Sequence, residues 1–131
     1  MTGLDTNVLV RYIMQDDAKQ SAKANQLIDS LTGEAPGFVP LVAVVELVWV
    51  LSSCYGLTRA QLAQALGALL RAKQLVVDQT EQVARALRVF SDGTADFADC
   101  LIERTASQAG CDRTMTFDVT AAKTAGMTLV R

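Results

Sequence analysis

The stretch that decides the fold is MTGLDTNVLVRY, residues 1–12. Residues 1–4 form a short strand candidate that ends at Asp5. Thr6 and Asn7 then open a segment with apolar residues at positions 8, 9, 12 and 13, which is helical spacing. An acid between a strand and the following helix is placed where parallel α/β sheets bind their ligands, outside the carboxyl ends of the strands.

The same alternation of short apolar runs and longer helical segments continues to the C-terminus. It predicts further strands at 37–41, 75–78, 114–117 and 127–130, and helices at 17–33, 41–55, 58–73, 80–91, 96–110 and 119–123. Strands that alternate with helices imply a parallel sheet covered on both faces. We therefore expect an α/β fold, a three-layer sandwich with a short, mainly parallel central sheet of about five strands flanked by helices. A length of 131 residues suits a single domain, 1–131.

Composition excludes several classes of protein. The chain has no histidine, which rules out Ser-His-Asp triads, Cys-His pairs and His-ligated zinc. A net charge of -2 argues against a simple polybasic nucleic-acid binder. Cys54, Cys100 and Cys111 have no CxxC spacing, so we expect small buried residues in a reducing compartment. No signal peptide or membrane-length apolar run is visible, which predicts a soluble cytoplasmic protein with no membrane partner.

Several carboxylates lie at positions that suit a catalytic or ligand-binding site. Asp5 and Asp118 each follow a predicted strand, where they either converge on a ligand or serve as helix N-caps. Glu46 is the only polar residue between Leu41 and Leu51. If it is buried, it must be paired or bound to a cation, because burying a lone carboxylate costs several kcal/mol. The alternative is that it lies on one wet face of a buried helix.

Asp96 and Asp99 lie three residues apart at a predicted helix start, where like charges repel unless a cation or the helix dipole offsets them. Asp96 suits an N-cap as well as a catalytic role, whereas Asp99 lies one turn in, where capping no longer explains it. Carboxylates without histidine or thiolate motifs select Mg²⁺ or Mn²⁺. Without these five acids, nine acidic residues stand against twelve basic ones, so a mildly basic rim could bind a phosphodiester backbone. Its candidates are Arg11, Lys19, Lys23, Arg59, Arg104, Arg113 and Lys123.

Four segments of the chain resemble the PIN-domain ribonucleases, specifically the VapC-type toxins of bacterial toxin–antitoxin systems. These segments are LDTNVLVRY at 4–12, FVPL at 38–41 with VELVWVL at 45–51, ADFADCLI at 95–102, and TFD at 116–118 followed by Ala122 and Lys123. Val119 and Thr120 depart from the pattern, because relatives often carry a charged residue there.

The resemblance implies a Mg²⁺-dependent endoribonuclease, with Mn²⁺ as the other possible ion. Carried over by position, the acidic quartet is Asp5, Glu46, Asp99 and Asp118, with Asp5 and Asp99 in direct contact with the metal. The supporting polar groups are Thr6, Asn7, Asp96 and Thr116. The implied partners are an RNA substrate, a VapB-type antitoxin and a second copy of the chain.

The sequence leaves two other functions open, and it leaves one other explanation for the apolar helices that favour a dimer. A haloacid-dehalogenase-like phosphatase would use Asp5 as nucleophile, but its motif requires a second Asp at the position where this chain has Asn7. A catalytically inactive RNA-binding module would have lost an acid of the quartet. A homodimer is favoured because the helices at 41–51 and 63–70 are apolar on most sides, although a deep internal core would explain the same pattern.

Overall fold

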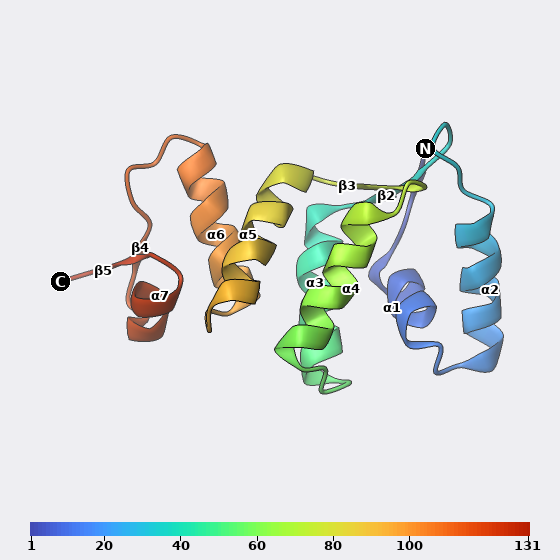
Figure 1. Ribbon diagram of the computed structural model, residues 1–131, viewed down its shortest axis with the longest axis horizontal. Coiled ribbons are helices and arrows are strands. Elements are labelled where there is room, and N and C mark those ends of the chain that lie inside the picture. Colours follow the sequence, from blue (N-terminus) through green and yellow to red (C-terminus); the bar gives the residue numbers. More distant parts are fainter. The chain divides into compact units, whose positions relative to one another are not determined.

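The computed structural model describes residues Met1–Arg131, which divide into two compact units, Met1–Thr80 and Glu81–Arg131. The N-terminal unit contains β1 (Thr2–Gly3), α1 (Thr6–Met14), α2 (Ala18–Asp29), β2 (Gly37–Val39), α3 (Leu41–Ser53), α4 (Arg59–Arg71) and β3 (Leu75–Val77). The C-terminal unit contains α5 (Thr80–Asp92, whose first residue closes the N-terminal unit), α6 (Phe97–Gln108), β4 (Met115–Thr116), α7 (Val119–Thr124) and β5 (Thr128–Leu129). Figure 1 shows these elements along the chain.

The N-terminal unit is built on a parallel sheet of order β1-β2-β3. Gly37 pairs with Thr2 on one side and with Leu75 on the other. A Cβ atom at Gly37 would come within 2.8 Å of the side chains of Leu31 and Leu4. The middle strand therefore begins with glycine because the neighbouring leucines already fill the space.

The helices of this unit bury one stripe each against the sheet and one another. Leu9, Ile28, Val39 and Leu47 are fully covered, and α1 packs on both α2 and α3. Their burial contributes roughly 1.5–3 kcal/mol per large aliphatic side chain. The N-terminal unit thus has a core of its own, and the loops between its strands and helices lie at the surface.

Side-chain caps fix where the helices begin. Thr58 and Gln61 form the expected reciprocal capping box at α4. Asp17 accepts from the backbone of Gln20, but the Gln20 side chain does not return the bond and instead accepts from Arg11 Nε. α3 begins at Leu41 after Pro40, which has no capping side chain, and Asp78 of the next strand end accepts from the Leu41 backbone at 3.2 Å.

The C-terminal unit joins two helices to a second pair of strands. Phe90 of α5 and Phe97 of α6 meet edge to face, with ring centroids 5.8 Å apart. β4 and β5 pair in parallel, and α7 packs on both. Phe97 is 1% exposed and so anchors the start of α6, the segment that carries the second group of acids.

The predicted mixed α/β class is confirmed, with seven helices, five short strands and parallel pairing throughout. The strands are hydrogen-bonded as a sheet of three and a sheet of two. No helix is long and apolar enough to cross a membrane. The expected burial of the cysteines is wrong for two of them: Cys100 is buried, but Cys54 at the end of α3 and Cys111 after α6 are exposed, since both lie where a helix has run into a turn.

Candidate active site

Asp5 lies directly beyond the first strand and caps the first helix. Leu4 is buried, and its backbone N–H donates to Phe38 in the middle strand at 2.9 Å, which fixes the segment up to Asp5. The Asp5 side chain is exposed and accepts from the Thr6 backbone at 2.8 Å. One carboxylate oxygen of Asp5 thus caps α1, and the other has no protein partner.

Thr6 connects this strand end to α3. Thr6 is 4% exposed, and its hydroxyl donates to the Glu46 carboxylate across the contact between α1 and α3. The stated alternative to burial holds for Glu46: its side chain is exposed, on the face of α3 that also carries the exposed Val42 and Trp49. The buried hydroxyl of Thr6 thus orients the exposed carboxylate of Glu46.

We predict that Thr6→Val destabilises the chain by about 1 kcal/mol, because the substitution removes the hydroxyl and with it the only protein hydrogen bond of the Glu46 carboxylate. Thr6→Ser keeps the hydroxyl and should restore most of that stability. Urea denaturation of the three proteins measures the difference. A Thr6→Val protein as stable as its parent would show that the hydrogen bond contributes nothing.

Asp96 and Asp99 open α6 in the C-terminal unit. Asp96 is the N-cap, and one of its carboxylate oxygens accepts from the Asp99 backbone at 3.4 Å. Asp99 lies in the first turn and is half-buried between Ala98 and the fully buried Cys100. The capping alternative therefore holds for Asp96, whereas no helix-terminal hydrogen bond explains the Asp99 side chain.

Asp118 ends the β4 segment and caps α7. Its Oδ1 accepts from the backbones of Thr120 at 2.8 Å and Ala121 at 3.1 Å. Thr116 accepts from the Asp118 backbone at 3.0 Å, so this threonine orders the strand end rather than a ligand. The predicted supporting role of Thr116 thus has a local structural explanation.

The candidate acids of the C-terminal unit interact electrostatically. Burial raises the pKa of Asp99, and the charges of Asp96 and Asp118 raise it further. None of the acids Asp5, Glu46, Asp96, Asp99 and Asp118 forms an ion pair with lysine or arginine. Mutual repulsion without a cationic partner is the electrostatic state that a divalent cation relieves.

The structure thus shows two groups of acids, each in its own unit. Asp5 and Glu46 are linked through Thr6 in the N-terminal unit, and Asp96, Asp99 and Asp118 interact in the C-terminal unit. Neither unit by itself gathers three carboxylate or thiol side chains in an arrangement that could hold a metal. Asn7 is exposed on α1 and lines a groove towards α2 instead of joining Glu46.

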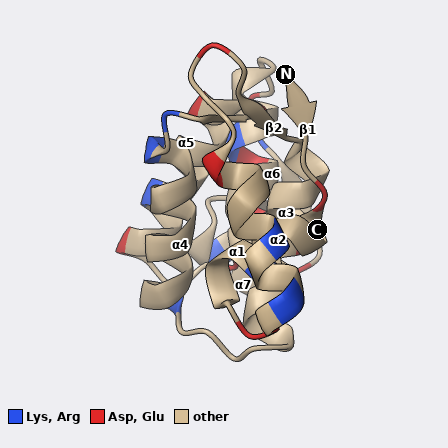
Figure 2. Ribbon diagram, turned by 90° about the vertical axis from the view of Figure 1, so that its right-hand side faces the viewer, with Lys and Arg blue, Asp and Glu red and all other residues tan.

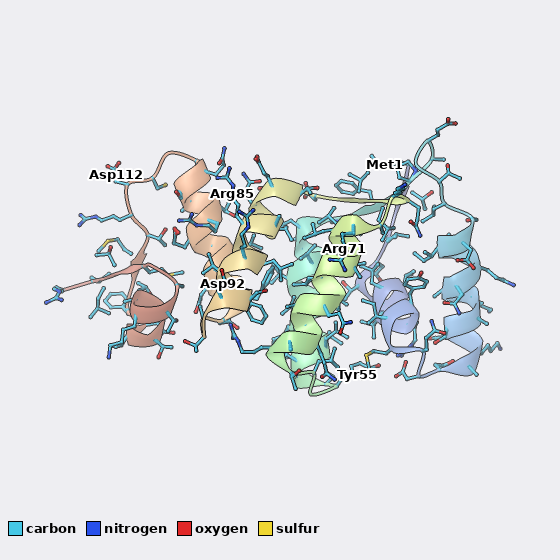
Figure 3. The ribbon with its side chains drawn as sticks, viewed as in Figure 1. Met1, Tyr55, Arg71, Arg85, Asp92 and Asp112 are labelled. Carbon is cyan, nitrogen blue, oxygen red and sulfur yellow. The ribbon has the colours of Figure 1, made fainter.

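Sequence patterns did not identify two features of this region. Asp78 reads as the end of a strand, yet its carboxylate caps α3, the helix that carries Glu46. Tyr55, labelled in Figure 3 just after α3, joins Arg11 and Asp16 in a surface network. The residues that form each of these contacts are far apart in the sequence. The only sequence signal for either contact is the position of Asp78 directly after a predicted strand.

The PIN domain family model matches residues 4–127, which is nearly the whole chain. No curated protein matches the chain.

Proposed function

The chain belongs to the PIN-domain family, whose members are nucleases, and from that premise we propose a Mg²⁺- or Mn²⁺-dependent endoribonuclease. The observation that carries the proposal is the set of acids in the two units that have no cationic partner, including Asp99 with its raised pKa. The family match spans both units, which supports their acting as one nuclease domain.

We assign a role to each acid from its hydrogen bonds and its position in the fold. Asp5 in the N-terminal unit and Asp99 in the C-terminal unit serve as metal ligands, since each keeps a carboxylate oxygen without a protein hydrogen-bond donor. Glu46 and Asp118 position the attacking water or bind a second ion, and Thr6 holds Glu46 in place. Asp96 supports Asp99 by capping its helix. Oxygen-only donor sets of this kind suit Mg²⁺ and Mn²⁺.

The proposed reaction is hydrolysis of an RNA phosphodiester by water. A divalent ion bound there would lower the pKa of water and neutralise charge on the scissile phosphate. With no histidine in the chain, a carboxylate such as Glu46 is the side chain suited to accept the proton of the attacking water. Attack by water with the ribose 3′-oxygen as leaving group, which takes up a proton, leaves 5′-phosphate and 3′-hydroxyl ends. Single-stranded or looped RNA suits the site, because its backbone can be approached closely.

Cleavage of an RNA substrate with Mg²⁺ or Mn²⁺, set against a chelator and against Asp5→Asn, tests the proposal. The proposal expects activity only with metal and only with Asp5. A phosphatase of the haloacid-dehalogenase type would instead form an aspartyl-phosphate on Asp5 and release phosphate from small phosphoesters. An inactive RNA-binding module would bind RNA and cleave nothing with or without metal.

We further propose that the nuclease is the toxin of a toxin–antitoxin pair, acting in the cytoplasm. The unpaired acids would be neutralised by an arginine or lysine on a C-terminal segment of a VapB-type antitoxin. Added antitoxin should abolish cleavage, and an antitoxin variant without that cation should inhibit poorly. Undiminished cleavage in the presence of antitoxin would contradict this role.

A homodimer is the third part of the proposal. Val42 and Trp49 of α3 are 76% and 63% exposed, while Leu47 on the same helix is buried, so α3 carries one apolar face into the core and another to the surface. Exposed tryptophan on an apolar patch is typical of interface anchors.

We expect Trp49→Glu to convert a dimer into a monomer, because a carboxylate on that face would have to be desolvated in the interface. Light scattering at tens of micromolar measures the mass of both proteins. Ile102→Glu on α6, another exposed apolar residue, serves as the matched control and should leave the dimer intact. A monodisperse monomer for the parent chain would contradict the dimer.

A further inference from the structure

A groove between α1 and α2 begins beside Asp5. Its volume is about 270 Å³, and one end is lined by Asn7, two residues beyond the Asp5 cap. Its floor is aliphatic, formed by Val8, Ala24 and Leu27. Its walls carry the polar side chains of Arg11, Gln20 and Lys23. Figure 2, turned so that α2 is near the viewer, shows basic positions along this helix.

Arg11 is held in a fixed orientation on one wall of the groove. Its Nε donates to Gln20 at 2.7 Å, and its Nη1 donates to Tyr55 at 3.0 Å and to Asp16 at 3.2 Å. The Tyr55 hydroxyl in turn donates to Asp16 at 2.7 Å, and this bond is the main cause that lowers the pKa of Asp16. The carboxylate that orients Arg11 therefore stays ionised through the neutral range.

This network leaves part of the guanidinium available. A guanidinium has five N–H donors, and the contacts of Arg11 use Nε and Nη1, so both N–H groups of Nη2 have no protein acceptor. The side chain keeps 30% of its surface exposed. Arg11 is thus a pre-oriented donor that loses little conformational entropy on meeting an anion.

Lys23 supplies a second cation from the facing helix. It is exposed on α2, lines the same groove and forms no ion pair with any acid of the chain. Arg11 lies about 8 Å along the α1 axis from Thr6, at 1.5 Å per residue, so this cation follows Asp5 along α1, and Lys23 lines the same groove from α2. Two cations, two amides and an aliphatic floor suit a chain of phosphates whose riboses and bases rest on apolar surface.

We propose that the α1–α2 groove binds the RNA chain beside the scissile bond, with a backbone phosphate held between Arg11 and Lys23. The inference rests on the proposed ribonuclease function and adds to it the path of the substrate. Gln20 and Asn7 complete the wall as amide donors, and Tyr55 acts as a positioning residue for Arg11.

Binding of a labelled single-stranded RNA to the full chain in chelator tests the groove without cleavage. We expect Lys23→Gln to weaken binding about fivefold at low salt and to reduce the slope of log affinity against log salt by about 0.7, the value for one phosphate contact on a single strand. Arg11→Gln should weaken binding at least as much. Lys73→Gln is the matched control, because Lys73 is an exposed lysine after α4 that lies outside the groove and forms no ion pair, and it should leave the slope unchanged.

Tyr55→Phe tests the positioning role, because it removes the hydroxyl that orients Arg11 without altering the lining of the groove. We expect weaker RNA binding with an unchanged salt slope, since no charge is lost. An affinity equal to that of the parent would overturn this role for Tyr55.

The remaining outcomes separate the groove from the nuclease proposal. Equal slopes for the Lys23→Gln and Lys73→Gln proteins would overturn the groove as a specific site, and so would parental affinity in both the Arg11 and Lys23 variants, while metal-dependent cleavage would still stand. Groove-dependent binding with no cleavage under any metal would keep the groove and overturn the nuclease proposal. A polyglutamate peptide that binds the groove more tightly than RNA would show a protein site and overturn the RNA assignment.

Discussion

Asp99→Asn is expected to reduce RNA cleavage at least about a hundredfold, because even groups that only support a metal ligand typically contribute 10- to 100-fold. The metal-free protein should be as stable as its parent or slightly more stable. Burial and the charges of Asp96 and Asp118 raise the pKa of Asp99, so its ionised form is unfavourable in the folded chain. A neutral amide removes that repulsion, which for like charges three residues apart is about 0.2–0.5 kcal/mol.

Cleavage rates and thermal melts in chelator check both halves of this prediction. Asp112→Asn is the matched control: Asp112, labelled in Figure 3, is an exposed aspartate in the turn after α6, and its charge is not among the causes that raise the pKa of Asp99. It should retain full cleavage. If Asp99→Asn unfolds the chain instead, Asp99 is a structural residue and its assignment as a metal ligand is wrong.

Mg²⁺ or Mn²⁺ at about a hundred times its dissociation constant is expected to stabilise the chain by about 2.7 kcal/mol, because the ion binds the folded state preferentially. For a chain of this length that corresponds to a rise in Tm of about 10 °C. The candidate acids Asp5, Glu46, Asp96, Asp99 and Asp118 have no lysine or arginine partner, so the ion replaces repulsion with attraction.

Scanning calorimetry with increasing Mn²⁺ measures this shift, with potassium chloride at matched ionic strength as the control for general screening. Asp5→Asn and Asp99→Asn should each lose most of the shift. A Tm that Mn²⁺ leaves unchanged, or that rises equally with potassium chloride, would contradict a specific metal site.

The fold was predictable because its signals are local. The βα unit around Asp5, the capping box of Thr58 and Gln61, and the strand ends at Val77 and Thr116 are each specified by residues within a few positions of one another. The ends of some elements differ from the prediction by a few residues. The helix expected to reach Gly33 ends at Asp29, with Ser30 as its C-cap. Ends fray in this way because the last turn of a helix gains few hydrogen bonds.

The candidate site was predictable only in part, because its contacts join distant segments. Strand-end position pointed to Asp5 and Asp118, and both indeed cap the helices that follow. The hydrogen bond from Thr6 to Glu46, the capping of α3 by Asp78 and the network of Arg11, Asp16 and Tyr55 depend on how α1, α3 and β3 pack. No local pattern encodes such pairs, and the apolar run around Glu46 suggested burial where the structure has an exposed face.

The chemistry of the product ends tests the central claim most directly. A single-stranded RNA incubated with the purified chain should be cut only when Mg²⁺ or Mn²⁺ is present, and the fragments should carry 5′-phosphate and 3′-hydroxyl groups. An Asp5→Asn protein purified in parallel should yield no fragments, which also excludes a contaminating nuclease. Fragments ending in 2′,3′-cyclic phosphate, cleavage that persists in chelator, or equal cleavage by Asp5→Asn would contradict a metal-dependent hydrolysis carried by these carboxylates.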